Sequence, residues 1–164
     1  MQLVRNGAEV VRVGMAEVYV AAPPAVLRTT LGSCIGVVLH DRVRKTSGIA
    51  HVMLPRMTNR DSSVGKYANT AIPHLLREME QRGSRRADIS AHIAGGASMF
   101  ATEGRIARIG DMNAEETLRV LGELGIPVAF SDTGGGSGRT IEFDSVAGVL
   151  HVRTMPNQAA RARS

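Results

Sequence analysis

The stretch IGVVLHDRVRKTSGIAHVML, residues 35–54, decides the fold that this sequence predicts. Two β-rich runs, 35–40 and 47–54, flank the polar segment DRVRKT, which has the composition of a hairpin connection. If the runs pair antiparallel about the centre of that segment, the numbers of paired residues sum to about 85 to 87. Either odd sum places His51 on the same face as Cys34, directly across or one diagonal away, and an even sum turns it to the other face. The sequence leaves the register open.

Strand patterns extend from this hairpin toward both ends of the chain. Residues 9–21 are rich in valine and partly alternate, with a break at Gly14, and Pro23 and Pro24 end the pattern. Further runs toward the C-terminus are separated by glycine-containing turns. The predicted strands after the hairpin are ADISAHIAGG (87–96), IPVAFSD (126–132), RTIEFD (139–144) and VLHVRTM (149–155).

Residues 66–83, KYANTAIPHLLREMEQRG, repeat apolar side chains at helical spacing and predict a first helix. Pro73 favours a start of the regular helix near Ile72, because proline suits a first turn better than a helix interior. Gly83 is the expected stop.

Residues 114–124, AEETLRVLGEL, predict a second helix. Asn113 is the expected N-cap, with Glu116 three residues later as in a capping box, and Gly125 is the expected end. Two helices among many strands indicate an α+β layered domain.

The composition indicates a single cytoplasmic domain. The chain has 164 residues, of which 43% are hydrophobic, and this is enough for one sizeable core. No apolar run reaches the roughly 18 residues of a membrane-spanning helix, and the N-terminus lacks the long apolar segment of a secretory signal. One cysteine excludes an internal disulfide and suits a reducing compartment. We therefore expect one domain over residues 1–164, without membrane insertion and with a frayed tail at 155–164.

The formal net charge of +5 raises the question of an acidic partner. The arginines are scattered along the chain, so no predicted helix carries a basic stripe. Aromatic residues make up only 3%, which leaves few stacking platforms for single-stranded nucleic acid. The charge therefore indicates a solvated surface or docking to an acidic protein, and no nucleic-acid partner is expected.

Cys34 is the candidate nucleophile, although an unpaired cysteine beside isoleucine and valine also fits a small core residue. A Gly-Ser pair precedes it and leaves room for a substrate and for backbone N–H groups to face that substrate. The thiol needs a base, because its ordinary pKa of about 8.5 leaves little thiolate at neutral pH. Hairpin parity offers His51 as that base. Thr29 and Thr30 offer hydroxyls that either orient an imidazole or simply favour β structure.

The other histidines are weaker candidates. His40 precedes Asp41 and suits a surface ion pair, whereas His74 falls on the first predicted helix. His92 lies in a predicted strand before a glycine pair, and His151 belongs to the last hairpin. The sequence contains neither HExxH nor CxxC, and a lone cysteine cannot build a thiolate-rich zinc site. No metal site is expected.

Two glycine clusters allow close approach of backbone to a ligand or a tight turn. GGGSGR, residues 134–139, lacks the Lys-Ser/Thr ending of a phosphate loop and lies between predicted strands, so it predicts a tight connection. Gly95 and Gly96 follow a predicted strand and are the better candidates for the wall of a site.

Six blocks of the sequence together resemble the CheD family of chemoreceptor glutamine deamidases. The blocks agree in order and spacing, and the resemblance spans roughly residues 10 to 154. They are TTLGSCIGVVLHD (29–41), SGIAHVMLP (47–55), KYANTAIPHLL (66–76), IAGGASMF (93–100), IGDMNAEETLRVLGELGIPV (109–128) and DTGGGSGRTIEFD (132–144). Two departures are IGDMN, where relatives commonly have IGERN, and His92, where they often have lysine.

The resemblance implies a three-layered α/β/β domain and an enzyme with a cysteine nucleophile and no cofactor. The implied reaction is hydrolysis of selected glutamine side chains to glutamate in methyl-accepting chemotaxis receptors, through a thioester. In some species the family also binds the phosphatase CheC, which makes CheC a candidate partner.

The resemblance also implies roles for individual residues. Cys34 matches the nucleophile and His51 the general base. Many relatives place the orienting threonine where this chain has Arg28, and a shorter TxLGSC form aligns with Thr29, so Thr29 takes the role and Thr30 is its rival.

Backbone groups of the same region are candidates for the oxyanion site and the pocket wall. The N–H groups around Ser33 and Cys34 are the nearest donors for a tetrahedral oxyanion. Gly32, Gly95 and Gly96 are further candidates for pocket backbone.

Two functions from other classes also fit the sequence. A thiol acyltransferase acting on another protein amide would need an amine that outcompetes water at the thioester. A non-catalytic adaptor would keep the fold in order to bind receptors or CheC. The presence of both Cys34 and His51 favours the enzyme over the adaptor.

Overall fold

The computed structural model describes residues 3–57, 63–98 and 108–156, which form two α-helices and ten strands. In chain order the elements are β1 (Leu3–Arg5), β2 (Ala8–Arg12), β3 (Val18–Ala21), β4 (Ala25–Leu31), β5 (Ile35–Asp41), β6 (Ser47–Val52), α1 (Ala68–Gln81), a 3-10 turn (Arg86–Asp88), β7 (Ile89–Gly95), α2 (Ile109–Leu124), β8 (Val128–Thr133), β9 (Arg139–Asp144) and β10 (Val149–Thr154).

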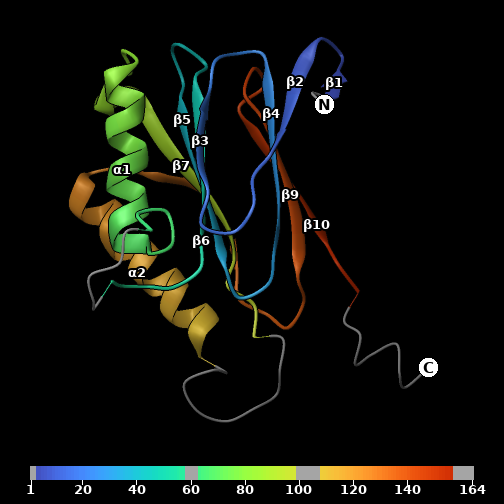
Figure 1. Cartoon of the computed structure of the whole chain (residues 1–164), viewed down its shortest axis with the longest axis vertical. Coiled ribbons are helices and arrows are strands. Elements are labelled where there is room, and N and C mark those ends of the chain that lie inside the picture. Colours follow the sequence, from blue (N-terminus) through green and yellow to red (C-terminus); the bar gives the residue numbers. More distant parts are fainter. Residues whose placement is uncertain (1–2, 58–62, 99–107, 157–164) are drawn as a thin grey trace.

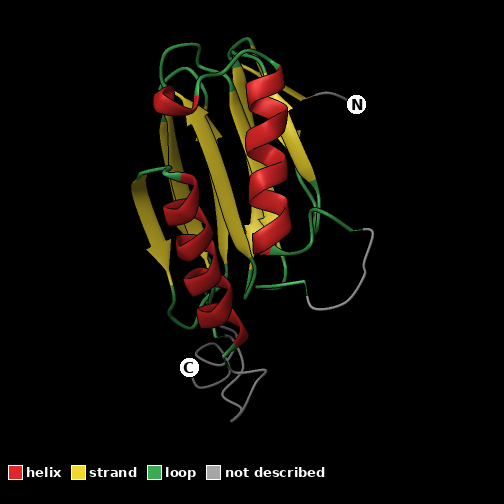
Figure 2. Cartoon of the chain, turned by 90° about the vertical axis from the view of Figure 1, so that its left-hand side faces the viewer, coloured by secondary structure: helices red, strands yellow, loops and turns green. Residues whose placement is uncertain are grey.

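The strands form two five-stranded sheets that stack on each other. The central sheet has the order β3-β6-β5-β7-β8, and the outer sheet has the order β1-β2-β4-β9-β10. Both helices cover one face of the central sheet, and the outer sheet covers its other face (Figure 1). Figure 2, turned by 90°, shows α1 and α2 side by side in front of the strands. This arrangement confirms the predicted α+β class and its three α/β/β layers.

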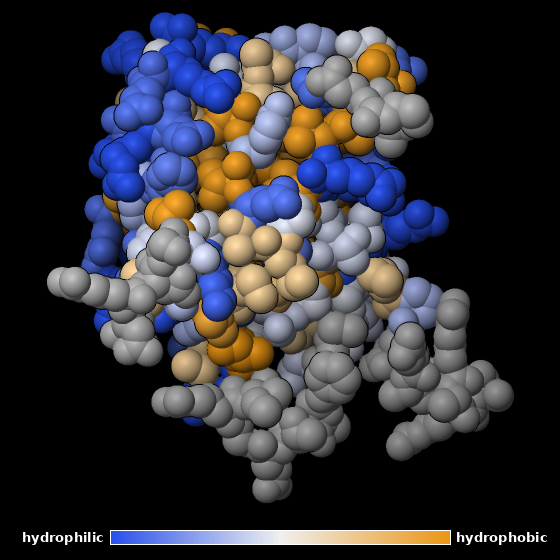
Figure 3. All heavy atoms as spheres, in the orientation of Figure 1, coloured by the Kyte–Doolittle hydropathy of each residue, from blue (hydrophilic) through white to orange (hydrophobic). Residues whose placement is uncertain are grey.

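The inner strands of the central sheet are buried on both faces because other layers cover them on both sides. Every residue of β5 is buried. Ile35, Val37 and Leu39 of β5 pack beneath the helices, whereas Val38 packs with Phe143 of the outer sheet. Figure 3 shows hydrophobic residues in the middle of the molecule and hydrophilic residues along the side on which α1 lies. Two apolar layers therefore hold the central sheet in place.

The hairpin β5–β6 has one of the two predicted odd registers. Ile35 pairs with Val52 and Gly36 pairs with His51. Extended by one residue, the same register would set Cys34 opposite Met53 and one diagonal from His51. His51 therefore shares the face of β6 that meets the outer sheet.

Helix α1 begins at Ala68, so the predicted start near Ile72 is wrong. The Ala68 N–H donates to the carbonyl of Leu54 at 3.0 Å, which anchors a first turn upstream of the proline. Pro73 consequently lies inside the helix. The helix ends as predicted, with Gly83 in a left-handed conformation at φ +101°.

Helix α2 begins at Ile109, so the prediction of Asn113 as its N-cap is also wrong. Asn113 lies inside the helix and is completely buried. Gly125 ends the helix in the left-handed conformation, as predicted. Asn113 therefore does not cap this helix.

His40 is buried between the sheets, which corrects its prediction as a surface residue. Its Nδ1 lies 2.8 Å from the Ser47 hydroxyl, and its ring packs edge-on against Phe143. His92 packs against the same phenyl ring at 4.9 Å between centroids. Burial lowers the pKa of His40 to about 4 and lowers the pKa of His92. Both imidazoles are therefore neutral parts of the core.

Neither helix in the described part of the chain is long and apolar enough to cross a membrane. Of the tail predicted to fray, Met155 is described and exposed, and residues 157–164 lie outside the described residues.

Candidate active site

The segment Gly32–Cys34 joins β4 of the outer sheet to β5 of the central sheet, and we call it the nucleophile loop after the role predicted for Cys34. The turn after β7 supports it, since the Ala97 N–H donates to the Gly32 carbonyl at 3.0 Å and the Gly96 N–H to the Cys34 carbonyl at 2.9 Å. Gly95 has φ +112°, and a Cβ there would lie 2.2 Å from the Cys34 carbonyl oxygen. Only glycine fits this contact.

His51 reaches from the central sheet toward the outer sheet, where it meets Thr29 of β4. The Thr29 hydroxyl lies 2.8 Å from His51 Nδ1 and 2.6 Å from the carbonyl oxygen of Val13. The carbonyl can only accept, so it takes the single hydroxyl hydrogen, and Thr29 must then accept from Nδ1–H. This chain of bonds leaves the lone pair on His51 Nε2, which is the form a general base requires.

Strand alternation in β4 separates the two candidate threonines. Thr29 is 4% exposed and faces the central sheet, whereas Thr30 is exposed and its hydroxyl lies 3.3 Å from that of Thr140. Only Thr29 lies beside His51. The Val13 carbonyl accepts the last hydrogen bond of this series. Sequence reasoning could not predict its part, because every residue has a backbone carbonyl.

Burial shifts the pKa values of Cys34 and His51 in opposite directions. It raises the pKa of the Cys34 thiol and lowers the pKa of His51. The Val13 carbonyl and the Glu17 carboxylate partly oppose the shift at His51. Both shifts favour the uncharged forms of the two side chains.

The amides of Ser33 and Cys34 have no backbone carbonyl partner within the described ranges, although the Cys34 amide interacts with its own sulfur. The amide of Gly96, in contrast, is used to hold the nucleophile loop. The structure therefore places Gly32, Gly95 and Gly96 in the backbone contacts that support the loop, and the oxyanion role of the Ser33 and Cys34 amides stays a prediction.

A groove of about 400 Å³ opens beside His51 on the surface. Its lining comes from the end of β2, the β2–β3 connection, β4 and β6, and it includes two arginines. The lining residues are Arg12, Val13, Gly14, Met15, Arg28, Thr29, Thr30 and His51. An extended or helical segment of a protein substrate can approach the base along this groove.

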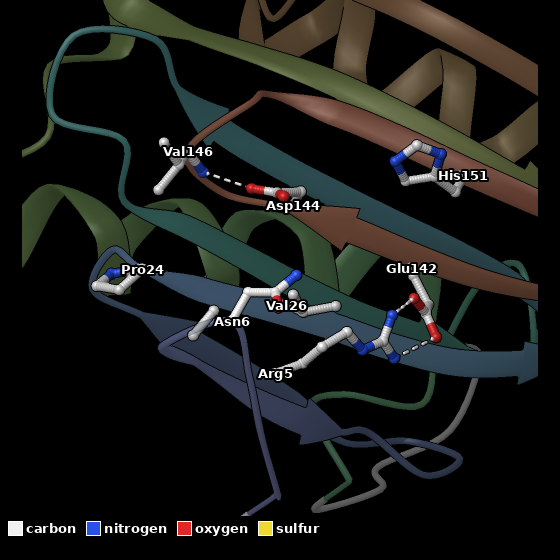
Figure 4. Close-up of a pocket in the computed structure, with 9 residues that line it drawn as sticks. Arg5, Asn6, Pro24, Val26, Glu142, Asp144, Val146 and His151 are labelled. Carbon is white, nitrogen blue, oxygen red and sulfur yellow. Dashed lines mark hydrogen bonds and ion pairs between the residues drawn. The ribbon is translucent and has the colours of Figure 1, made fainter.

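A second hollow, of about 350 Å³, lies over the outer sheet (Figure 4). There the two guanidinium nitrogens of Arg5 bind the Glu142 carboxylate at 2.8 and 3.1 Å. Asp144 accepts from the Val146 amide at 2.9 Å, and His151 is the one aromatic ring among the labelled side chains. None of the candidate catalytic side chains lines this hollow.

The part of the chain that the structure describes contains no group of three histidine, cysteine or carboxylate side chains able to hold a metal ion. His74 lies on α1, where its Nε2 approaches the Glu78 carboxylate at 3.3 Å. The side chain that the structure orients is His51, through its bond to Thr29.

The Thr29→Val substitution is expected to slow the Cys34-dependent reaction about tenfold to 100-fold, because it frees the imidazole to change tautomer and orientation. It should also lower the free energy of unfolding by about 1–3 kcal/mol, since the buried Val13 carbonyl loses its donor. Rates from a discontinuous amide-hydrolysis assay and urea titrations measure both effects.

Thr30→Val is the matched control for this prediction, as it removes the same hydroxyl from the exposed face of the same strand. Its stability should stay within about 0.5 kcal/mol of wild type, with an unchanged rate. The reverse ranking of the two variants would move the role to Thr30, and two near-wild-type rates would remove threonine from the mechanism.

Comparison with known proteins identifies the family. The family model described as CheD chemotactic sensory transduction matches residues 53–154. The "Probable chemoreceptor glutamine deamidase CheD" of Clostridium novyi is 45% identical over 150 residues, covering 88% of this chain and 93% of that protein. The "Chemoreceptor glutamine deamidase CheD" of Halalkalibacterium halodurans is 45% identical over 158 residues, covering 90% and 94%.

A more distant relative and a solved structure extend the comparison. The "Probable chemoreceptor glutamine deamidase CheD" of Methanococcus maripaludis is 40% identical over 146 residues, covering 88% of this chain and 95% of that protein. The crystal structure of the Bacillus licheniformis hypothetical protein YfiH is similar at a TM-score of 0.47 and 17% identity, covering 71% of this chain and 49% of that one. The sequence matches are near full length on both sides, and this chain belongs to the CheD family.

Proposed function

We propose that this chain hydrolyses glutamine side-chain amides of chemoreceptors to glutamate through a thioester on Cys34. Curated relatives at 45% identity carry the name chemoreceptor glutamine deamidase. The observation that carries the proposal for this chain is the bond of Thr29 to His51 Nδ1 at 2.8 Å. This bond leaves Nε2 of His51 free to act as a base. His51 pairs with Gly36 of β5, the strand that follows the nucleophile loop.

The proposed reaction begins when His51 Nε2 takes the thiol proton while Sγ of Cys34 attacks the δ-carbon of the glutamine. The carbonyl π-electrons move to oxygen, and the amides of Ser33 and Cys34 stabilise that oxyanion. Collapse of the intermediate breaks the C–N bond, and the imidazolium gives its proton to the leaving ammonia. The product of this half is a thioester.

Hydrolysis of the thioester uses the same groups in reverse roles. His51 Nε2 takes a proton from water, and the hydroxide equivalent attacks the thioester carbon. The second oxyanion collapses, the C–S bond breaks and the sulfur regains the proton from the imidazolium. The glutamate leaves and the resting thiol is restored, without a cofactor.

The groove beside His51 supports a protein substrate over a free amino acid, because it continues past the base along β4 and the β2–β3 connection. A cytoplasmic setting belongs to the proposal, since the chemistry needs a reduced thiol. Docking of CheC stays a prediction of the family resemblance.

The test incubates the purified chain with the cytoplasmic fragment of a chemoreceptor in heavy-oxygen water and maps the peptides by mass spectrometry. Deamidation should convert particular glutamines to glutamate carrying one heavy oxygen atom. An added primary amine distinguishes the acyltransferase, which would attach the amine instead of water. Binding of the fragment without any conversion would support the adaptor and refute the proposed function.

A further inference from the structure

The three successive carbonyl groups of the nucleophile loop are all held by hydrogen bonds from the same neighbourhood. The carbonyls of Gly32 and Cys34 accept from the backbone amides of Ala97 and Gly96, as described above. The Ser33 carbonyl between them accepts from the side chain of Asn113, at 3.0 Å from Nδ2. The Asn113 side chain therefore supplies the third hydrogen bond to the loop, beside the two from backbone amides.

The direction of the Ser33 carbonyl fixes the direction of the Cys34 N–H. A trans peptide is planar, and its C=O and N–H bonds point in opposite directions. Since the Ser33 oxygen points toward α2, the Cys34 N–H points away from α2. That amide has no backbone acceptor within the described residues and is a candidate donor for the oxyanion.

Asn113 is held rigidly enough to impose this direction. It is completely buried, and its Nδ2 also donates to the carbonyl of Met53 at 3.0 Å. Both partners can only accept, so the amide nitrogen and not the oxygen faces them. The second bond ties the nucleophile loop to the residue after β6, the strand that carries His51.

The start of α2 has little freedom to move relative to the nucleophile loop. A Cβ built on Gly110 would lie 2.5 Å from the carbonyl oxygen of Gly96 and 2.7 Å from that of Ala97. The helix backbone thus packs directly on the turn that supports the loop. Asn113 lies one turn further along the same helix.

We infer that Asn113 is a positioning residue that holds the Ser33–Cys34 peptide in the orientation in which the Cys34 amide stabilises the oxyanion. The inference rests on the proposed function, and it adds a residue that contacts neither the substrate nor the reacting atoms. Loss of the side chain would let this peptide rotate, which removes the oxyanion donor and leaves the thiol and its base in place.

The test compares two reactions of the same thiol in Asn113→Ala. Deamidation of the receptor fragment develops an oxyanion, whereas alkylation of Cys34 by iodoacetamide does not. We expect kcat for deamidation to fall about 100-fold with KM little changed. The alkylation rate should stay within about twofold of wild type, because the pair of Cys34 and His51 is intact.

Thr117→Val is the matched control. Thr117 is completely buried one turn along the same helix, and its hydroxyl has no hydrogen-bond partner among the described residues. This variant should keep both rates. Asn113→Ser, which keeps one donor, should fall between Asn113→Ala and wild type in deamidation.

A measurement on the wild-type chain covers the case in which Asn113→Ala does not fold. A receptor peptide with an aldehyde in place of the glutamine amide should form a thiohemiacetal with Cys34, and the amide proton of Cys34 should then shift downfield in the NMR spectrum. An unchanged Cys34 resonance would overturn the inference.

The outcomes separate this inference from the proposed function. An active wild type with full deamidation in Asn113→Ala refutes the role of Asn113 alone. Equal losses of deamidation and alkylation also refute it, since they indicate a collapsed site. A wild-type chain that is alkylated but never deamidates the receptor fragment refutes the proposed function.

Discussion

Cys34→Ala is expected to abolish glutamine deamidation, with a loss of at least about 1000-fold, because no other side chain of the site can form the thioester. The loss should appear in kcat, measured by release of ammonia and by conversion of receptor peptides. Binding of the receptor fragment should remain, since the groove beside His51 is formed by other residues.

The same substitution should leave the fold nearly intact. Cys34 is only partly buried and packs at the margin of the core between the sheets. Removal of its sulfur should therefore cost less than about 1 kcal/mol of unfolding free energy. Cys34→Ser is the isosteric control and should be equally inactive. Retained activity, or a variant that mainly unfolds, would show that Cys34 is a core residue and not the nucleophile.

His51→Ala is the second substitution with a large expected effect. Deamidation should fall about 100-fold to 10,000-fold, as expected when a general base is removed. Alkylation of Cys34 near neutral pH should also slow, because the thiol has a raised pKa and depends on a neighbouring base. His74→Ala, at a partly exposed position of α1, is the control and should change neither rate.

The pH dependence of the wild-type rate carries the signature of His51. Burial lowers the pKa of this imidazole, so the base stays unprotonated below the ordinary histidine pKa of about 6.5. The rate of deamidation should therefore stay constant as the pH falls to about 6.5. It should decline only at lower pH, where the imidazole takes up a proton. An acid limb at or above that pH, or alkylation unchanged by His51→Ala at every pH, would contradict the assignment.

Local pattern was sufficient to predict most strands, whereas it left the register that decides the face of His51 open. Polar residues between two β-rich runs predicted the β5–β6 hairpin, and the parity of an odd register then placed His51 and Cys34 on one side. The choice of Thr29 over Thr30 came from resemblance, and in the structure it follows from strand alternation in β4.

Tertiary contacts decided what local pattern could not. The predicted start of α1 was wrong because the Leu54 carbonyl, distant in sequence, anchors an extra turn at Ala68. Asn113 has the residue type and spacing of an N-cap, and only the carbonyls of Ser33 and Met53 reveal that it is a buried bridge. Sequence spacing contains no information about such distant partners.

The neutral histidines between the sheets link the stability of the protein to acidity. An unfolded chain protonates His40 near pH 6.5, whereas the folded chain resists protonation until about pH 4. Between these values the unfolded state binds more protons, so every step downward in pH shifts the equilibrium toward unfolding. The lowered pKa of His92 acts in the same direction. Protonation of these buried histidines thus lowers the stability of the folded state at acidic pH, and it does so at a place separate from the Cys34 thiol.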